Sequence, residues 1–195
     1  FYVNSITVFN HFKPIIERNS SIFDIVISSK VNKAMVEKIH YELKDEKITI
    51  RSSQELIEKK LYYEKLVSNH GADCIEISIK NITNKKIKVT VPVIKLLGKK
   101  NIRFMYAAGK TKWNLSFWNK YYDGILCYGQ YHENRFKIRH KVPTAQMGYP
   151  RFDKYFNPGF DRDYLLTKFK CDPNKKTIVW LTTWTNLSSI NNYLK

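Results

Sequence analysis

The sequence predicts an α/β fold, a Rossmann-like parallel sheet with helices on both faces. Short apolar runs typical of buried parallel strands recur at residues 23–27, 102–106 and 124–129. Between them, apolar residues return at helical spacing, most clearly over 35–43. Some runs end in small or polar residues, as at 28–30, where a chain would leave a sheet. Strands that alternate with helices indicate a parallel sheet, because the helices supply the crossover connections.

The first element expected is a strand over residues 2–9, followed by a helical pattern over 9–16. Pro14 falls within that pattern and is expected only in a first turn or a loop, because proline has no amide hydrogen for a helix interior. A buried strand over 23–27 and a helix over 35–43 come next.

A short strand is expected over 47–50. Ser52 and Glu55 then fit a capping box that begins another helix. Residues 63–67 either extend that helix or form a strand, and the pattern leaves both open.

Two runs that alternate with period two, 74–79 and 87–93, predict a pair of strands joined by a hairpin loop over 81–86. Pro92 argues against a central strand, so residues 91–97 are expected to begin a helix instead.

Ligands of parallel α/β sheets bind beyond the carboxyl ends of the strands. The sequence places such ends at 28–30, 68–71, 107–110 and 128–129. Binding residues are therefore expected in these four segments.

Residues 1–147 are expected to form one domain, 148–175 a linker with a short helix over 161–170, and 176–195 the start of a second domain. No apolar run is long enough to cross a bilayer, and no signal peptide is visible. Because the chain begins at Phe1 without Met, it is interpreted as a piece of a longer protein.

Three cysteines are widely spaced and show no CxxC pairing: Cys74, Cys127 and Cys171. They are interpreted as reduced, mostly buried thiols of a cytoplasmic protein.

The net charge of +17 is concentrated in one stretch. Between Glu76 and Asp123 there is no acidic residue, while eleven cations occur: Lys80, Lys85, Lys86, Lys88, Lys95, Lys99, Lys100, Arg103, Lys110, Lys112 and Lys120. Such a basic block attracts anionic partners. Aromatic residues over 113–122 suit either a membrane interface or a groove for single-stranded nucleic acid. The third interpretation is a solvated basic face with aromatic residues in the core.

Gly109-Lys110-Thr111 is not a phosphate loop, because Phe104 stands where that motif needs glycine. The small residues before Lys110 still let backbone approach a ligand closely, and the lysines add charge. Gly109, Lys110 and Lys112 are therefore candidate phosphate-binding residues, helped by any helix that begins there. The alternative is a small-residue turn packed under a neighbour.

The histidines show no metal spacing, and neither a metal nor a cofactor is expected. His70 alone follows a predicted strand end. It is a candidate general base for an acceptor hydroxyl, with a structural loop or core histidine as the alternative.

Three phrases lie in order along the second half: YDGILCYG at 122–129, MGYPRFD at 147–153 and KTIVWLTTW at 176–184. Together they resemble the CDP-glycerol glycerophosphotransferase-like family of GT-B transferases, which build teichoic-acid and capsule-type polymers. The resemblance covers about residues 104–184. It implies that the chain is the N-terminal half of a GT-B architecture, with the acceptor bound by the first domain and the CDP-linked donor by the second.

The resemblance also implies site residues. Arg151 lies in the phrase that closes the family's first domain and is expected to contact phosphate or polymer. Thr183 and Trp184 match the end of the phrase that opens the second domain, whereas Thr182 stands where that phrase has proline. Thr182 and Thr183 are expected near the interdomain cleft. Ala108 departs from the family, which usually has a histidine base there, so the base is missing or supplied elsewhere.

The resulting hypothesis is a transferase domain for cell-wall or capsule biogenesis, located in the cytoplasm and peripherally on the inner face of the cell membrane. Its expected partners are a nucleotide-linked polyol or sugar donor, an anionic polymer or lipid-linked acceptor, and an anionic membrane surface. The chain alone is not expected to be active, because donor-site residues would lie beyond Lys195. The rivals are an enzyme that uses a UDP-sugar, a non-catalytic binding module and a binder of single-stranded nucleic acid.

Overall fold

The computed structural model describes residues 1–44, 46–69, 73–105, 109, 111–156, 159 and 161–178. The chain divides into two compact units, residues 1–153 and residues 154–195. Each unit is described by itself below.

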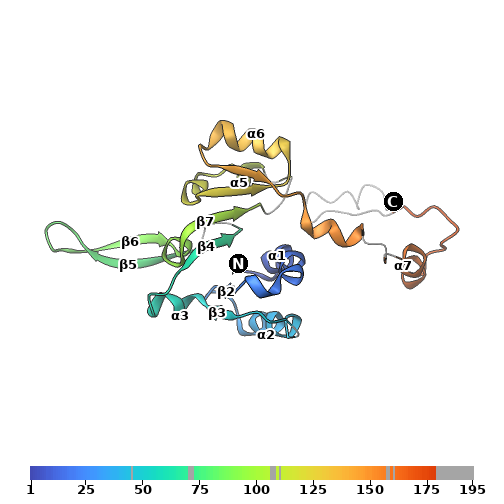
Figure 1. The fold of residues 1–195 in the computed structure, drawn as a ribbon, viewed down its shortest axis with the longest axis horizontal. Helices are drawn as coiled ribbons and strands as arrows, with labels where there is room; N and C mark the ends of the chain where they lie inside the picture. The colour runs from blue at the N-terminus through green and yellow to red at the C-terminus, as the bar shows by residue number, and fades with distance from the viewer. Residues whose placement is uncertain are drawn as a thin grey trace, which may run out of the picture. The chain divides into compact units, whose positions relative to one another are not determined.

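A seven-stranded parallel sheet forms the centre of the first unit (Figure 1). Its strand order is β3-β2-β1-β4-β7-β8-β9, and all neighbouring strands are parallel. The strands are β1 (Tyr2–Val3), β2 (Ile25–Ile27), β3 (Ile50–Ser52), β4 (Tyr63–Ser68), β7 (Gly98–Phe104), β8 (Gly124–Cys127) and β9 (Thr144–Gln146). The order reverses between β1 and β4, as in a doubly wound sheet. The predicted Rossmann-like α/β class is therefore confirmed.

Helices cover both faces of this sheet. Side chains of successive strand residues point to opposite faces, and accordingly Val3 and Tyr2 belong to different core clusters. The Val3 cluster holds residues of α1 (Ile6–Arg18) and α2 (Lys33–Glu42). The other face carries α3 (Ser53–Glu58), α4 (Val93–Leu97), the 3-10 helix η2 (Phe117–Tyr121) and α6 (Gln130–Arg139).

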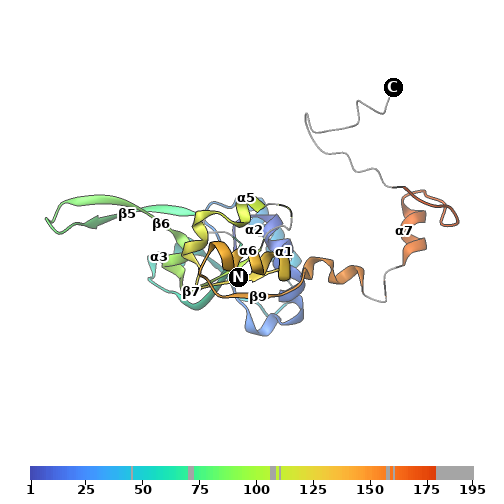
Figure 2. The ribbon, with the colours of Figure 1, turned by 90° about the horizontal axis from the view of Figure 1, so that it is seen from above.

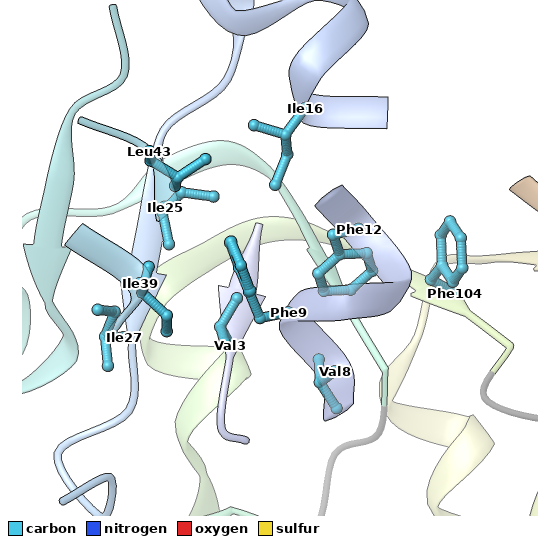
Figure 3. Packing of buried hydrophobic residues seen from close by; sticks show 10 residues of the cluster. All are labelled: Val3, Val8, Phe9, Phe12, Ile16, Ile25, Ile27, Ile39, Leu43 and Phe104. Atoms are coloured by element: carbon cyan, nitrogen blue, oxygen red, sulfur yellow. The ribbon is translucent and has the colours of Figure 1, made fainter. Parts of the chain in front are cut away.

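The core under α1 is built from aromatic and β-branched side chains (Figure 3). Phe9 and Phe12 of α1 are fully buried, and Phe12 meets Phe104 of β7 edge to face with 5.0 Å between ring centroids. Burying one such side chain stabilises the fold by about 1.5–3 kcal/mol. This contact joins α1 to a strand about ninety residues later in the sequence.

The strand expected over residues 2–9 is wrong beyond Val3. Ser5 instead caps α1, its hydroxyl accepting a hydrogen bond from the Val8 amide at 3.2 Å. Pro14 lies inside α1, which corrects the expectation that it would fall in a first turn or a loop. The helix tolerates it because Phe12 and Ile16 on either side are fully buried against the sheet.

Other local expectations have mixed outcomes. Residues 63–67 form part of strand β4, which resolves the ambiguity left by the sequence. The strand expected over 47–50 is misplaced, because β3 runs over Ile50–Ser52. Ser52 caps α3 by accepting from the Gln54 amide at 3.2 Å. Glu55 does not complete the capping box, since its carboxylate binds Lys59 at 2.7 Å.

Two expected strands form an antiparallel ribbon, β5 (Cys74–Lys80) with β6 (Lys86–Pro92). The ribbon projects away from the parallel sheet in both views (Figures 1 and 2). Helix α4 follows it directly, so the helix expected over 91–97 is confirmed from Val93 onward, whereas Val91 and Pro92 belong to β6.

Three elements were not expected from the sequence: α5 (Thr111–Asn114), α6 and β9. The first is a single turn, and α6 buries only Phe136, so neither leaves a clear apolar stripe in the sequence. Two further 3-10 helices are η1 (Ser20–Ile22) and η3 (Pro150–Tyr155). The boundary between the two units falls within η3.

The second unit contains the short helix expected in the linker, α7 (Arg162–Lys168). Asp161 caps it by accepting from the Tyr164 amide at 2.9 Å. The second-domain start expected over 176–195 falls almost entirely outside the described residues and stays a prediction.

The cysteines are free thiols, but only Cys127 is buried, while Cys74 and Cys171 are half-buried. The expectation that most would be buried is thus wrong. Burial raises the pKa of the Cys127 thiol.

Candidate functional site

The switch point of the sheet lies between β1 and β4. From here the chain winds toward β2 and β3 on one side, and toward β7, β8 and β9 on the other. The crossovers diverge at the carboxyl ends of β1 and β4, where doubly wound sheets bind their ligands. We call this edge, from β3 across to β8, the carboxyl-edge site.

The buried Arg103 links several of the segments that form the carboxyl-edge site. Arg103, near the end of β7, is 1% exposed. Its guanidinium donates to the carbonyl of Asn114 at 2.6 Å, to Oδ1 of Asn114 at 3.0 Å and to Oδ1 of Asn119 at 2.6 Å. Its Nε donates to the carbonyl of Asn69 at 3.4 Å. One side chain thus ties the end of β4 to α5 and η2.

The guanidinium of Arg103 is also stacked between two aromatic rings. Its central carbon lies 4.3 Å from the ring centroid of Trp118 and 5.5 Å from that of Phe136. Burial lowers the pKa of Arg103 to about 10, opposed by the nearby Tyr122 and Tyr128, so the group stays charged at neutral pH. Amide oxygens and π-faces solvate this charge in place of water.

A second polar network lies where the ribbon joins the sheet. The hydroxyl of Tyr2 donates to Oδ2 of Asp73 at 2.8 Å, across 71 residues of sequence. Burial raises the pKa of Tyr2. Lys30, just after β2, places Nζ 4.0 Å from Oδ1 of Asp73 and donates to the carbonyl of Cys74 at 3.4 Å. Beside this network, Ser68 and Tyr122 share a buried hydrogen bond of 2.8 Å.

A cavity of about 320 Å³ opens at the carboxyl ends of β2 and β3. Polar side chains supply much of its lining: Ser28, Ser29, His40, Arg51, Ser52 and Gln54. The size is at the lower end of small-molecule sites. Ser28 and Ser29 were expected to bind ligand, because they follow a predicted strand. Arg51 and Ser52 were not among the expected binding residues, because no ligand-binding strand end was predicted there.

The segment 147–153 packs against the carboxyl ends of β7 and β8. The Met147 amide extends the β9 pairing by donating to the Cys127 carbonyl at 2.8 Å. The ring of Tyr149 lies 4.3 Å from Tyr128 and 6.1 Å from His11, measured between centroids. Burial, and then the positive charge of Arg151, lower the pKa of His11 to about 4. The segment therefore brings Arg151 into electrostatic reach of α1.

The candidate residues named from the sequence divide into two groups. Gly109, Lys112 and Arg151 are described and exposed, and Lys112 lies on the single turn α5. A helix of one turn has too few aligned peptides for a strong anion site at its amino end. His70, Lys110, Thr182 and Thr183, together with Ala108, lie outside the described residues, so their placement stays a prediction.

The described residues of the basic block are spread over several elements. They lie on the ribbon, on α4 and β7, and on α5 and η2. Arg103 is buried and adds nothing to the surface, whereas Lys95 pairs with Asp123 at 3.9 Å and Lys99 with Glu64. The following aromatics also separate: Trp113 and Phe117 are exposed, and Trp118 and Tyr122 are buried. The expectation of aromatic residues in the core is confirmed for Trp118 and Tyr122, and the expectation of a ligand surface stays a prediction.

A second hollow of about 270 Å³ is lined by residues of β4, β7, β8 and β9, and its lining is mostly apolar. Among the described residues, no group of three or more His, Cys, Asp or Glu side chains is arranged to hold a metal ion. Within the same residues, every helix is too short or too polar to cross a membrane.

Comparisons of the chain with known proteins found no match. No family model matches the chain, and neither the curated proteins nor the solved structures include one similar enough to count as a match.

Proposed function

We propose that residues 1–147 form the acceptor-side domain of a GT-B-type transferase. Such an enzyme would move a phosphopolyol or sugar unit from a CDP-linked or other nucleotide-linked donor during cell-surface polymer synthesis. The observation that carries the proposal is the doubly wound sheet whose carboxyl edge receives the segment 147–153. That segment is one of the three phrases that resemble the CDP-glycerol glycerophosphotransferase-like family.

The chemistry of the edge fits an anionic acceptor. Lys112 and Arg151 are exposed cations that could each bind a phosphate of a polyol-phosphate chain. The polar cavity beside β2 and β3 would hold one polyol unit through hydroxyl and amide groups. Arg103 would act as a positioning residue, because it fixes α5, which carries Lys112, against the end of β4.

In the proposed reaction, an acceptor hydroxyl attacks the phosphorus or sugar carbon of the donor and loses its proton to a base. The cations would hold the acceptor phosphates and so orient that hydroxyl. His70 remains the candidate base, and a second domain would bind the donor. This division of labour predicts that the present chain binds acceptor but not donor.

The proposal is tested by measuring the affinity of the chain for a glycerol-phosphate oligomer and for CDP-glycerol. We expect the oligomer to bind and CDP-glycerol not to bind. Replacing Lys112 and Arg151 together by Ala should weaken oligomer binding roughly 20–30-fold, since each contact contributes about 1 kcal/mol. The matched control is the double change Lys141→Ala and Arg139→Ala, which removes the same charges from exposed positions at the end of α6 and just after it.

Two results would contradict the proposal. Tight binding of CDP-glycerol would make this the donor side. Loss of oligomer binding in the control pair equal to that in the test pair would mean that net charge alone, without a site, attracts the polymer.

A binding module for single-stranded nucleic acid is the second candidate. The exposed rings of Trp113 and Phe117, beside Lys112 and Lys120, are the observation that favours it. Under that reading, Trp113→Ala would weaken binding of an oligonucleotide by about 1–3 kcal/mol while leaving glycerol-phosphate binding unchanged. An oligonucleotide that does not bind at moderate salt would exclude it.

A further inference from the structure

The β5–β6 ribbon has an apolar face that the sheet does not use. Its register pairs Ile75 with Val91, Ile77 with Val89, and Ile79 with Ile87. Because alternate residues of a strand share a face, these three cross-strand pairs form one aliphatic stripe. Ile75, at the base, packs against the core cluster of the first unit. The stripe continues outward from there.

The outer part of the stripe is open to solvent. Ile79 and Ile87 are 42% and 41% exposed, and Ile82 at the tip is fully exposed. Ile77 and Val89 are only half-buried. An isolated two-stranded hairpin is marginally stable in water, so an aliphatic face of this size on a projecting ribbon indicates a surface that meets something else.

The tip is a well-formed turn that presents Ile82. Oδ1 of Asn81 accepts from the amides of Thr83 and Lys85, at 3.1 and 2.9 Å. Asn84 has a φ of 58°, a conformation that asparagine tolerates well. The fully exposed isoleucine is therefore held outward by a specific turn.

The opposite face and the tip are cationic. Lys80 pairs across the ribbon with Lys86, and Lys85 and Lys88 lie beside them. The only carboxylate of the ribbon is Glu76, which lies 3.2 Å from Lys88. Two like charges directly opposite each other destabilise a hairpin, so Lys80 and Lys86 favour a bound state that supplies negative charge.

We propose that the β5–β6 ribbon docks the protein on an anionic lipid surface. The aliphatic stripe and Ile82 enter the boundary between headgroups and acyl chains, and the lysines extend their ammonium groups to the lipid phosphates. This amphipathic arrangement is the one by which interfacial helices bind anionic bilayers, here carried by a ribbon.

Two features favour a lipid surface over a protein partner or a second copy. The ribbon carries four lysines and no arginine or aromatic residue, whereas protein interfaces are enriched in arginine and aromatic residues and depleted in lysine. Pairing with a second copy would bring two positively charged ribbons together, on chains that each carry a net charge of +17. The two copies would repel each other.

The base of the ribbon is joined to the carboxyl-edge site. The Val93 amide donates to the carbonyl of Asp73 at 2.7 Å, and Asp73 accepts from Tyr2. Seven residues of strand extend about 23 Å. A docked ribbon would thus keep the site within roughly that distance of the bilayer.

The test is flotation of the full chain with vesicles of phosphatidylcholine alone or mixed with phosphatidylglycerol. We expect binding to the anionic vesicles only. The pair Ile77→Thr and Val89→Thr, which keeps β-branched residues in the strands, should reduce binding at least about tenfold. Its control is the apolar exchange Ile77→Val with Val89→Ile, which should bind as the wild type does.

The charges are tested separately, because exposed lysines can be changed without unfolding the chain. The pair Lys80→Gln and Lys86→Gln should weaken binding about 30-fold. The pair Lys33→Gln and Lys38→Gln on α2 removes the same charge away from the ribbon and should have a much smaller effect.

Three outcomes would overturn the proposal: no binding to anionic vesicles, ribbon variants that bind as the wild type does, or an α2 pair as damaging as the ribbon pair. A dimer in lipid-free solution that the threonine pair converts to a monomer would assign the stripe to a second copy instead. The assay contains neither donor nor acceptor, so its failure would leave the proposed transferase function untouched.

Discussion

Individual residues in this protein illustrate how burial changes the role of a charge. Arg103 belongs to the same acid-free stretch as the surface lysines, yet it is buried and bound by four amide oxygens and two aromatic rings. Its rigid fork suits several oxygens at fixed positions, which a lysine ammonium could not reach together. The residue is therefore structural, in support of the site.

Replacing Arg103 by Met should destabilise the protein by about 3 kcal/mol or more, because buried oxygens of Asn114 and Asn119 would lose their donors. Replacing it by Lys should rescue only part of that loss. Urea unfolding measures both. The control is Arg135→Met, since Arg135 also stacks on an aromatic ring, Tyr131 at 5.0 Å, but is exposed. Equal losses at the two positions would contradict the role assigned to Arg103.

His11 should make stability depend on pH. Its pKa is lowered from 6.5 to about 4 in the folded chain, so the unfolded chain binds the proton more readily. Stability is then constant above about pH 6.5 and falls as pH drops from there toward 4, by about 2 kcal/mol at pH 5. Urea unfolding of wild type and His11→Gln at pH 7 and pH 5 checks this, with His40→Gln as the exposed control. A pH dependence that survives in His11→Gln would assign it to other groups.

At the scale of elements, short local signals decide where helices and strands begin and end. Ser5, Asn32, Ser52 and Asp161 each accept a hydrogen bond from a first-turn amide, and a helix begins after each. Gly98 is different, because it joins α4 to β7 where packing is tight. A Cβ at this position would lie 2.6 Å from Cβ of Leu66.

Gly98→Ala should therefore destabilise the protein by about 1–3 kcal/mol, since Leu66 and Asn101 would have to move within the core. Thermal unfolding provides the measurement. Gly129→Ala is the matched control, because a Cβ there meets no atom within 4 Å. An unchanged melting temperature in Gly98→Ala would mean that the start of β7 shifts freely.

At the scale of the whole molecule, the three core clusters all lie within the first unit. Among the described residues, those of the first unit alone make up the clusters on both faces of the sheet. The first unit thus contains what a cooperative fold needs, including both polar networks of the carboxyl-edge site.

A chain that ends at Asp153 should accordingly fold by itself. We expect it to unfold in a single cooperative transition, with a melting temperature within a few degrees of the full chain. Circular dichroism during heating tests this. A non-cooperative transition would show that residues after 153 complete the core.

Much of the fold could be read from local patterns. The alternation of buried strands and helices predicted the α/β class, period-two runs predicted the ribbon, and Asp161 marked the start of α7. Such signals extend over a few residues and are set by backbone geometry and capping. Local patterns also explain why the strand expected over residues 2–9 is wrong. The apolar residues between Val3 and Phe9 resemble a strand, but Ser5 caps a helix that begins at Ile6.

The sequence by itself determined the fold class, the ribbon and the concentration of positive charge between Glu76 and Asp123. Only the tertiary structure decided the strand order, the burial of Arg103 and the pairing of Tyr2 with Asp73. The reason is physical: periodicity records which face of an element is buried, but not which distant element buries it. Crossover connections bring residues 71 positions apart into hydrogen-bond contact, and no local pattern encodes that distance.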